Sequence, residues 1–434
     1  MSERRNMPIP EAVEINPKVK LQRGESYKFV EMADLVEKVT RVGSKETKEF
    51  KSSGAKFRVG DTLFARITPC LENGKIAKFT GLAGDLGFGS TEFIVFRGRD
   101  GITTTDYAHY LAIDPRFIDF AISKMTGSSG RQRVPVEALG HYSVSVPSID
   151  VQKSITKVLN DLDDKIDLLR EMNKTLEETA RAVFRAWLVD FEPVRAKAAG
   201  ATSFRGMPQE LFDTLPDSFE PSVIGAIPKG WTTEALIEQG NWINGAAYKN
   251  MHFSNDADAL PVVKIAELKK GVSTNTKFTN TDLGDKYRIN TGDLMFSWSG
   301  SPETSIDAFI WALGDAWLNQ HIFVVRPNGK KNVGYLFALL KHLKPKFIAI
   351  AKDKQTTGLG HVTRDDMKRM HVCEPNEAIL DRFSEFGQNI YDCILSNLVE
   401  MEKLAALRGT LLPKFISGEL KAPSLEALGL EGHK

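Results

Sequence analysis

The chain has 434 residues, of which 42% are hydrophobic and 26% charged, a globular composition long enough for two or three domains of roughly 150 residues. A formal net charge of +1 excludes a global basic field, so any affinity for nucleic acid must come from local stripes of cations. The three cysteines have no CxxC spacing, which argues against a disulfide framework and a zinc ribbon. The N-terminal stretch lacks the apolar segment of a signal peptide, and no run of about 18 uncharged apolar residues occurs, so we expect a cytoplasmic protein.

Residues 1–149 have the pattern of a small α+β module. Gly60-Asp61 is a turn dipeptide that leads into an apolar run, and FIVFR at 93–97 has the β-branched and aromatic residues of a buried strand. Pro135 stands where the first residue of a helix would, directly after the segment TGSSGRQRV at 126–134. The mixture of strand and helix signals predicts an independent domain.

A long helix is predicted over residues 150–192. Apolar residues advance by steps of four and three from Ile155 to Trp187, which is the pattern of a coiled-coil seam. The seam residues that we assign to this helix are Ile155, Leu159, Leu162, Ile166, Leu169 and Leu176. The connector that follows, 193–227, is rich in Pro, Gly and small residues, and we expect it to be ordered or semi-ordered.

Residues 228–375 repeat the first module block by block. FVEMADL at 29–35 matches VVKIAEL, GDTLFARITP at 60–69 matches GDLMFSWSGSP, TEFIVFR matches QHIFVVR, and the Thr-Gly segment at 126–139 matches 357–367. The order of the four blocks is the same, and the period is far too long for a solenoid repeat of about 20 to 50 residues. The sequence therefore predicts two similar α/β modules, the second with a capping box of Thr363 and Asp366.

A second long helix is predicted over residues 376–418, followed by a tail at 419–434. Its seam is weaker but keeps the same register, with Phe383, Ile390, Ile394, Met401, Leu404 and Leu411. Each helix would span on the order of 60 Å at 1.5 Å per residue, too long for its own module to cover, so we expect the two to pair. Antiparallel pairing would relate the modules by a pseudo-twofold axis. Asn173 and Asn397 would then either fix the register or lie at the edge of the seam.

With these features, the chain resembles the specificity subunit of type I restriction-modification enzymes. The helix ends AVFRAWLVDFEPV (182–194) and LRGTLLPKFISGEL (407–420) are similar to that family's two tails, and IGAIPKGW (224–231) is similar to the entry of its second recognition domain. The N-terminus departs from the family, because INPKVKLQRGESYKFVEMADL stands in place of an Ile-Pro-x-Gly-Trp entry. The resemblance covers essentially the whole chain.

The resemblance implies a DNA-binding adaptor that is not itself an enzyme. Its two target recognition domains would each read one half of a split, asymmetric site on double-stranded DNA, and the paired helices would set the gap between the halves. The chain would hold two modification (methyltransferase) subunits and, through them, the restriction (translocase and nuclease) subunits. S-adenosylmethionine, ATP and Mg would bind to these partners only.

Two surfaces are candidates for DNA contact. The first is the Thr-Gly loop of each module, where small residues let backbone amides approach phosphates and where Arg or Gln can reach base edges. Its candidate residues are Lys124, Ser128, Ser129, Arg131, Gln132 and Arg133 in the first module and Lys354, Gln355, Thr356, His361 and Arg364 in the second. The alternative is a helix-entry turn whose charges are merely solvated.

The second candidate surface is the loop after the Gly-Asp strand. Arg66 and Lys75 flank it in the first module, and Trp298 and Ser299 hold the corresponding place in the second. Loops that differ between parallel copies are where different sequences would be read. The alternative is that Trp298 belongs to the core and that Arg66 is a surface charge.

Signals for catalysis are weak. His321 aligns with Glu92 in the repeat, and each is more simply explained as a hydrogen-bonded structural residue than as a catalytic one. The sequence has neither a GxxxxGK[ST] nor a GxGxxG loop. A coiled-coil scaffold with two protein-binding heads is the competing interpretation, because its geometry would be the same.

Overall fold

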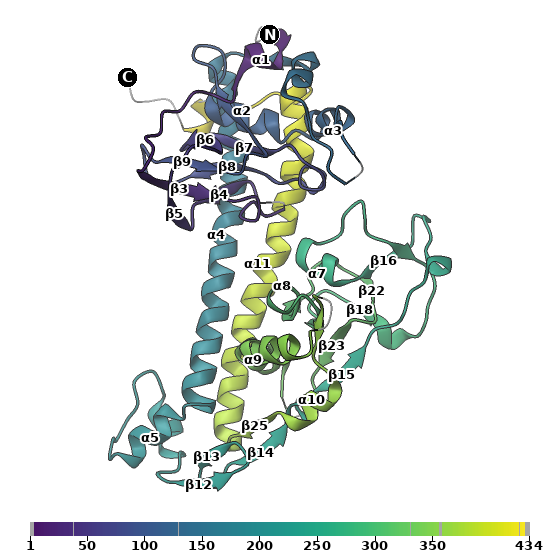
Figure 1. Cartoon of the computed structure of the whole chain (residues 1–434). Helices are drawn as coiled ribbons and strands as arrows, with labels where there is room; N and C mark the ends of the chain where they lie inside the picture. The colour runs from purple at the N-terminus through teal and green to yellow at the C-terminus, as the bar shows by residue number, and fades with distance from the viewer. Residues whose placement is uncertain are drawn as a thin grey trace. The chain divides into compact units, whose positions relative to one another are not determined.

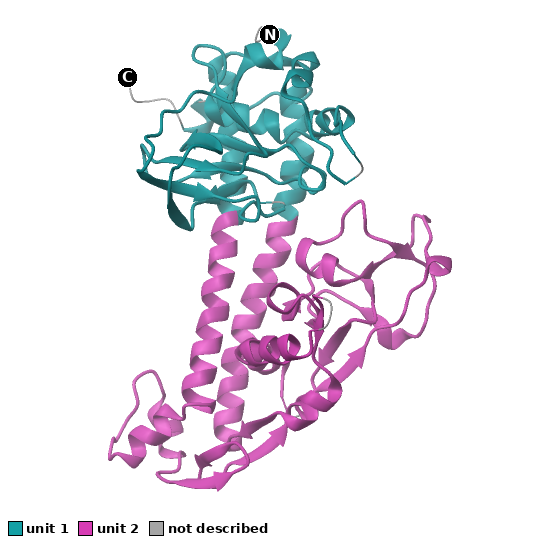
Figure 2. Ribbon diagram, in the orientation of Figure 1, with its two compact units in different colours: residues 1–166, 403–434 teal, residues 167–402 magenta. Residues whose placement is uncertain are grey.

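The computed structural model describes residues 4–37, 39–128, 130–329, 331–355, 358–424 and 426–429. The chain folds as two compact units: unit 1 is residues 1–166 with 403–434, and unit 2 is residues 167–402 (Figure 2). Two long helices, α4 (Ile149–Leu188) and α11 (Glu377–Ser417), each contribute residues to both units. Each unit therefore contains one α/β module and a stretch of both helices.

The module of unit 1 is built on two sheets (Figure 1). The first has the strand order β2-β10-β7-β8-β4, and its neighbours are antiparallel except for the parallel pair β4 and β8. Its strands are β2 (Val13–Ile15), β10 (Phe93–Gly98), β7 (Thr62–Ala65), β8 (Ile76–Thr80) and β4 (Arg41–Gly43). The second has the order β5-β3-β9-β6, with strands β5 (Glu46–Glu49), β3 (Ser26–Val30), β9 (Leu86–Gly89) and β6 (Ala55–Arg58).

Strand β10 is buried on both of its faces. Phe93 and Val95 belong to a core that residues of both sheets share, whereas Ile94 and Phe96 belong to a second core under the helices. Successive side chains of a strand point to opposite faces, so a strand covered on both sides is apolar throughout. This confirms the prediction of a buried strand from the run FIVFR.

Short helices cover the second core of unit 1. They are α1 (Ile9–Ala12), α2 (Thr105–Ala112) and α3 (Pro115–Ser123), and strands β1 (Arg5–Pro8) and β11 (Ser143–Val146) pair beside them. The side chains of Thr104 and Asp114 accept hydrogen bonds from backbone amides of the first turns of α2 and α3, as N-caps do. The helix expected after Pro135 is a 3-10 helix, η1 (Val136–His141), with Pro135 as its N-cap and not its first residue.

The module of unit 2 repeats this plan. One sheet has the order β15-β23-β19-β21, with strands β15 (Asn241–Asn244), β23 (Ile322–Arg326), β19 (Leu294–Ser297) and β21 (Asp307–Ile310). The other has the order β17-β16-β22-β18, with strands β17 (Phe278–Thr279), β16 (Leu260–Val263), β22 (Ala316–Leu318) and β18 (Arg288–Ile289). Shorter pairs are β12 (Phe219–Ser222) with β13 (Gly225–Pro228), β14 (Thr232–Ala235) with β25 (His371–Glu374), and β20 (Ser299–Gly300) with β24 (Gly360–His361). The helices of the module are η2 (Leu236–Gln239), η3 (Asn250–His252), α7 (Ile265–Lys270), η4 (Asp285–Tyr287), α8 (Pro302–Ser305), α9 (Val333–Asp353) and α10 (Arg364–Arg369).

Strand register shows that the two modules are copies of one fold. Phe93 pairs with Ala65 in the first module, and Ile322 pairs with Ser297 in the second. These are the positions that the sequence blocks align with each other. The capping box of Thr363 and Asp366 is present at the start of α10, as the sequence predicted.

The repeated Gly-Asp dipeptide has a structural role in both modules. Gly60 and Gly292 have φ of 93° and 94°, a conformation that favours glycine. Asp61 then binds Arg97 at the end of β10, with oxygen–nitrogen distances of 2.7 and 2.6 Å. Asp293 binds Arg326 at the end of β23 in the same way, at 3.4 and 3.2 Å. In each module this ion pair joins the turn to the arginine near the end of the apolar strand.

The loop that follows the first strand of the first-listed sheet differs in length between the two modules. Residues 16–25 join β2 to β3 in the first module, and residues 245–259 join the corresponding β15 and β16 in the second. The second loop is longer and contains η3. The strands before and after it keep the same pairing, so the insertion leaves the scaffold unchanged.

In unit 1 the long helices pack on the module and on each other. Asp163 of α4 binds Arg408 of α11, and the predicted seam residues Ile155, Leu159 and Ile166 are buried. Leu162, Leu404 and Leu411 are only half-buried. The buried residues at this end of α11 are instead Leu412, Phe415 and Ile416. The sequence missed them because they face the core of the module and not only the partner helix.

In unit 2 the two helices run antiparallel. Asn173 contacts Asn397, and farther along α4 the ring of Phe184 lies 5.4 Å from that of Phe383 on the earlier part of α11. Of the predicted seam residues in this unit, Leu169, Phe383, Ile390 and Ile394 are buried, and Leu176 and Met401 are half-buried. Phe184 and Leu188 are also buried although they lie outside the predicted seam. They pack on the aromatic core of the module, which includes Tyr335.

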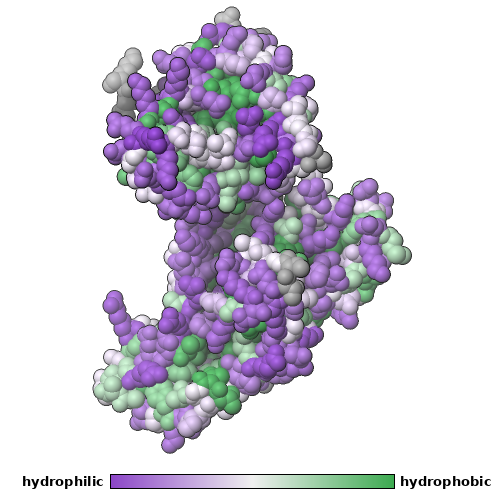
Figure 3. All heavy atoms as spheres, in the orientation of Figure 1, coloured by the Kyte–Doolittle hydropathy of each residue, from purple (hydrophilic) through white to green (hydrophobic). Residues whose placement is uncertain are grey.

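The connector after α4 is folded within unit 2. It contains α5 (Glu192–Ala198) and α6 (Gln209–Asp213), and the ammonium of Lys197 donates hydrogen bonds to the carbonyls of Phe212, Asp213 and Leu215 at 3.2, 2.8 and 2.6 Å. Apolar residues gather on the surface of this part of unit 2 (Figure 3, lower left). Val223 and Ile224, between β12 and β13, are exposed.

Over the residues described, none of the helices has the length and apolar character needed to cross a membrane.

Candidate nucleic-acid interface

The two candidate surfaces of each module are a single surface. The backbone amide of Val134, at the end of the Thr-Gly loop, donates to the carbonyl of Arg66 at 2.8 Å. In the second module the amide of Val362 donates to the carbonyl of Trp298 at the same distance of 2.8 Å. The strand-end loop and the Thr-Gly loop therefore lie side by side in both copies, and the backbone scaffold under them is the same.

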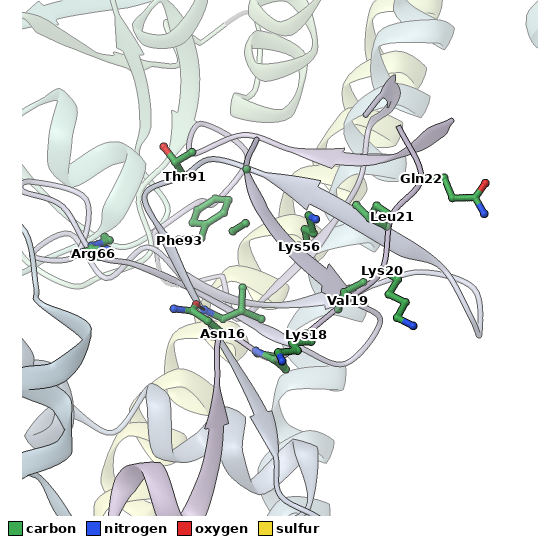
Figure 4. A pocket seen from close by; sticks show the side chains of 14 residues that line it. Asn16, Lys18, Val19, Lys20, Leu21, Gln22, Lys56, Arg66, Thr91 and Phe93 are labelled. Carbon is green, nitrogen blue, oxygen red and sulfur yellow. Dashed lines mark hydrogen bonds between the residues drawn. The ribbon is translucent and has the colours of Figure 1, made fainter. Parts of the chain in front are cut away.

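A cleft of about 920 Å³ opens from this surface in the first module. Its lining residues are Asn16, Pro17, Lys18, Val19, Lys20, Leu21, Gln22, Gly54, Ala55, Lys56, Arg66, Thr91, Phe93 and Val95. Figure 4 shows Arg66 and Gln22 toward opposite ends, with Phe93 and Lys56 between them. The cleft thus runs from the end of β7 to the loop that joins β2 and β3.

Asn16 determines where the cleft begins. Its φ is 51°, in the left-handed region that asparagine tolerates better than most residues. Its amide donates to the carbonyl of Val95 at 2.7 Å, and its side-chain oxygen accepts from the amide of Val95 at 3.0 Å. These bonds end the pairing of β2 with β10 and turn the chain away from the sheet, which leaves space beside Phe93.

The cleft is cationic. Its lining contains Lys18, Lys20, Lys56 and Arg66 and no Asp or Glu. Among the described residues, no carboxylate forms an ion pair with any of these four cations. Nε of Arg66 is buried and has no hydrogen-bond partner in the described part of the chain. A surface of this kind suits a polyanion.

Arg133 is engaged by the protein itself. Its guanidinium donates to both carboxylate oxygens of Glu92, at distances from 2.7 to 3.0 Å, and this bonding raises the pKa of Arg133. The amide of Arg66 donates to the carbonyl of Glu92 at 3.0 Å. Glu92 and Arg133 therefore hold the Thr-Gly loop against the strand ends.

The other candidates of the first module differ in their surroundings. Lys75 donates to the carbonyl of Met32 at 2.9 Å, and the ammonium of Lys124 lies 5.2 Å from the ring of Phe120. The backbone carbonyl of Gln132 accepts from the amide of Thr68 at 3.0 Å. Ser128 and Arg131 are exposed in the loop, and Ser129 lies outside the described residues.

In the second module aromatic groups stand in place of the free arginine. Nε1 of Trp298 donates to the side-chain oxygen of Asn244 at 2.9 Å, and its ring lies 5.5 Å from that of His321. Ser299 pairs with His361 across β20 and β24. The guanidinium of Arg364 lies 5.6 Å from the ring of Phe323 and donates to the carbonyl of Trp242 at 3.2 Å. The same scaffold thus presents different chemistry.

Lys354 is held by an acidic partner. Its ammonium donates to both oxygens of Asp366, at 2.6 and 2.5 Å. Burial alone would raise the pKa of Asp366, but the hydrogen bonds from Lys354, Thr363 and Arg369 outweigh it and hold the pKa well below its usual range. Gln355 is exposed, and Thr356 lies outside the described residues.

The lysines of the cleft were not predicted from the sequence. Lys18 and Lys20 lie in the segment that departs from the usual family entry, and Lys56 lies on β6 of the second sheet. The alternation of Lys18 and Lys20 in NPKVKLQ was the only available signal. The described residues contain no group of three or more His, Cys, Asp or Glu that could hold a metal ion.

Comparison with known proteins gives consistent matches over most of the chain. The model of the type I restriction modification DNA specificity domain matches residues 15–178 and again 228–397. The HindI specificity subunit of Haemophilus influenzae is 24% identical over 402 residues, which cover 83% of this chain and 86% of that protein. The MjaIX specificity subunit of Methanocaldococcus jannaschii is 24% identical over 337 residues, covering 75% of this chain and 71% of that protein. The crystal structure of a type I restriction-modification S subunit from M. genitalium has a similar fold, with a TM-score of 0.50 and 12% identity over 96% of each chain.

Proposed function

The chain belongs to the family of type I restriction modification DNA specificity domains, and we propose that it is the DNA-reading specificity subunit of a type I restriction-modification complex. Each module would read one half of a split sequence in double-stranded DNA. The observation that carries this proposal is the surface where the two loops of each module meet. It has one backbone arrangement in both copies and different side chains in each.

The difference between the copies supports an asymmetric target. The first module presents Arg66 in a cationic cleft, and the second presents Trp298, whose ring is tilted against that of His321. Base edges in the major groove differ in their donors, acceptors and methyl groups, so unlike side chains select unlike bases. The two halves of the recognised sequence would therefore differ.

The helices α4 and α11 would set the distance between the half-sites. Each of them continues from one unit into the other, and they pair antiparallel within unit 2. A change in their length would then change the tolerated gap and leave the half-sites as they are.

The proposal assigns the chemistry to partner subunits. Methyltransferase subunits would bind S-adenosylmethionine, and restriction subunits would bind ATP and Mg, while this chain contributes DNA recognition and no catalytic residue. Exposed apolar residues such as Val223 and Ile224 in unit 2 are of the kind that mark protein contacts, which supports a chain that assembles with partners.

Salt dependence tests the proposal. The full chain, purified with its modification subunit, is titrated with duplex DNA at several salt concentrations. Neutralised phosphates release counterions, so log affinity should fall linearly with log salt, with a slope of about −0.9 for each phosphate contacted. If the complex does not bind DNA, or if its affinity for DNA does not change with salt, the result would favour the alternative of a scaffold with protein-binding heads.

A further inference from the structure

We propose that Arg66 reads a guanine in the first half-site and that Lys18, Lys20 and Lys56 hold the DNA phosphates beside it. This inference rests on the proposed function and adds the division of labour within one module. Arg66, at one end of the cleft, would recognise the base, and the lysines of the cleft would contact the DNA backbone.

The backbone of Arg66 is fixed in position, and its side chain has an unsatisfied hydrogen-bond donor within the described part of the chain. It follows β7 directly, its amide donates to the carbonyl of Glu92 at 3.0 Å, and its carbonyl accepts from Val134 at 2.8 Å. Its side-chain Nε is buried without a hydrogen-bond partner among the described residues. A buried donor that is left unbonded costs free energy, which a ligand with an acceptor at this point would recover. The backbone therefore holds the guanidinium ready for an acceptor from outside the chain.

The neighbouring arginines are less suited to this role. Arg133 already binds both oxygens of Glu92, and breaking that pair would leave an unpaired carboxylate next to DNA. Arg131 is exposed in a turn, where its amide donates to the carbonyl of Ser128 at 3.0 Å. A side chain on the end of a strand is placed more accurately than one on a loop.

The chemistry of the cleft fits guanine and its flanking phosphates. Guanine presents two acceptors, O6 and N7, on its major-groove edge, and a planar guanidinium can donate to both. The three lysines carry point charges without carboxylate partners among the described residues, which suits phosphates. The lining of the cleft has four cations and no acid, so it attracts the phosphates of the DNA. The lysines would bind these phosphates, and Arg66 would bind the base.

The second module supplies a matched comparison. Trp298 occupies the position of Arg66, and its single donor, Nε1, is bonded to Asn244. In the first module Asn16 lines the cleft together with Arg66, and its side-chain oxygen accepts from the amide of Val95 and not from Arg66. A guanine at the corresponding place of the second half-site would find no free donor on Trp298. Recognition of guanine at this point is therefore a property of the first module alone.

The test is a binding selection. The full chain, purified with its modification subunit, is mixed with a pool of duplexes of random sequence, and the bound DNA is sequenced. The wild-type chain should select a bipartite motif with a G·C pair in the first half. Arg66→Lys keeps the charge but not the rigid pair of donors, so preference for that G·C pair should fall roughly 5- to 150-fold while the rest of the motif is unchanged. Arg66→Ala should lose the same preference.

Control variants separate base reading from backbone contact. The double variant Lys18→Ala, Lys20→Ala should weaken binding equally for all sequences and make the salt slope shallower by about 0.9 for each lost phosphate contact. Trp298→Ala should leave the first half of the motif as it is. Thermal unfolding of each variant shows whether it folds. If Arg66→Ala does not fold, the binding selection with Arg66→Lys tests the inference.

Three results would overturn the inference. If both Arg66 variants keep the wild-type motif, Arg66 does not read a base, although the proposed function stands. If Arg66→Lys preserves binding and Arg66→Ala weakens it equally for every sequence, Arg66 contacts phosphate. If the wild-type chain selects no motif, the proposed function fails and this inference with it.

Discussion

The side-chain amide of Asn397 on α11 donates a hydrogen bond to the side-chain oxygen of Asn173 on α4, with 2.7 Å between nitrogen and oxygen. Asn173 is only 8% exposed and Asn397 is half-buried, so the two residues meet in a partly buried part of the helix interface. A buried polar group needs a partner, and a shift of either helix would separate this one. The pair therefore favours a single register of the helices in unit 2.

Replacing only one asparagine should lower the free energy of unfolding by more than half of the loss caused by replacing both. Asn173→Leu leaves the amide of Asn397 without its partner, and we expect a loss of about 1–3 kcal/mol in the free energy of unfolding. The double variant Asn173→Leu, Asn397→Leu should lose less than the sum of the two single variants. Urea unfolding of the full chain measures all three. Strictly additive losses would show that the two amides are not coupled.

Asp61 and Asp293 occupy corresponding positions in the two modules, but Asp61 should contribute more to the free energy of unfolding. The side chain of Asp61 is fully buried against Arg97, whereas the side chain of Asp293 is 17% exposed and its bonds to Arg326 are longer. Asp61→Asn leaves a buried, uncompensated guanidinium, and we expect it to cost roughly 3–5 kcal/mol. Asp293→Asn, the matched control, should cost clearly less. Equal losses in unfolding free energy would contradict this ranking.

His342 should make stability depend on pH. Burial, and next the charges of Lys346 and Arg185, lower the pKa of His342 from 6.5 to about 4. Because the unfolded chain binds this proton more readily, His342 favours unfolding increasingly as pH falls from about 6.5 toward 4. His342→Gln removes that titration. The unfolding free energy of the variant relative to wild type should therefore rise as pH falls through this window, and a difference that is constant with pH would contradict the assignment.

The scaffold of this protein could be predicted from its sequence because the same motifs occur in both modules and because its strands and helices have clear patterns of apolar residues. Gly60-Asp61 and the run FIVFR predicted a turn and a buried strand, and the structure joins them through Asp61 and Arg97. Phe184 was missed since a seam pattern reports contact with one partner helix, whereas Phe184 also packs on Tyr335 of the module. Leu412, Phe415 and Ile416 were missed for the same reason.

The candidate interface could be predicted only in part. The Thr-Gly loop and the strand-end loop were predicted as two separate surfaces. They form one surface because hydrogen bonds such as that from Val134 to Arg66 join residues that are far apart in the chain. Arg133 looked like a free cation because nothing in its neighbouring sequence indicates Glu92 as its partner. The cleft depends on the left-handed turn at Asn16, and one asparagine does not predict such a turn.

The most direct test of the account changes the length of the helices. Seven residues, two helical turns, are inserted into α4 after Ile166 and into α11 before Lys403, the residues at which each helix passes from one unit to the other. The insertion adds about 10 Å at 1.5 Å per residue, which corresponds to about three base pairs of 3.4 Å. Methylated sites are then mapped by sequencing the DNA of cells that carry the wild-type or the lengthened chain with its partner subunits. The account predicts the same two half-sites with a gap longer by about three base pairs; an unchanged gap, or new half-sites, would contradict it.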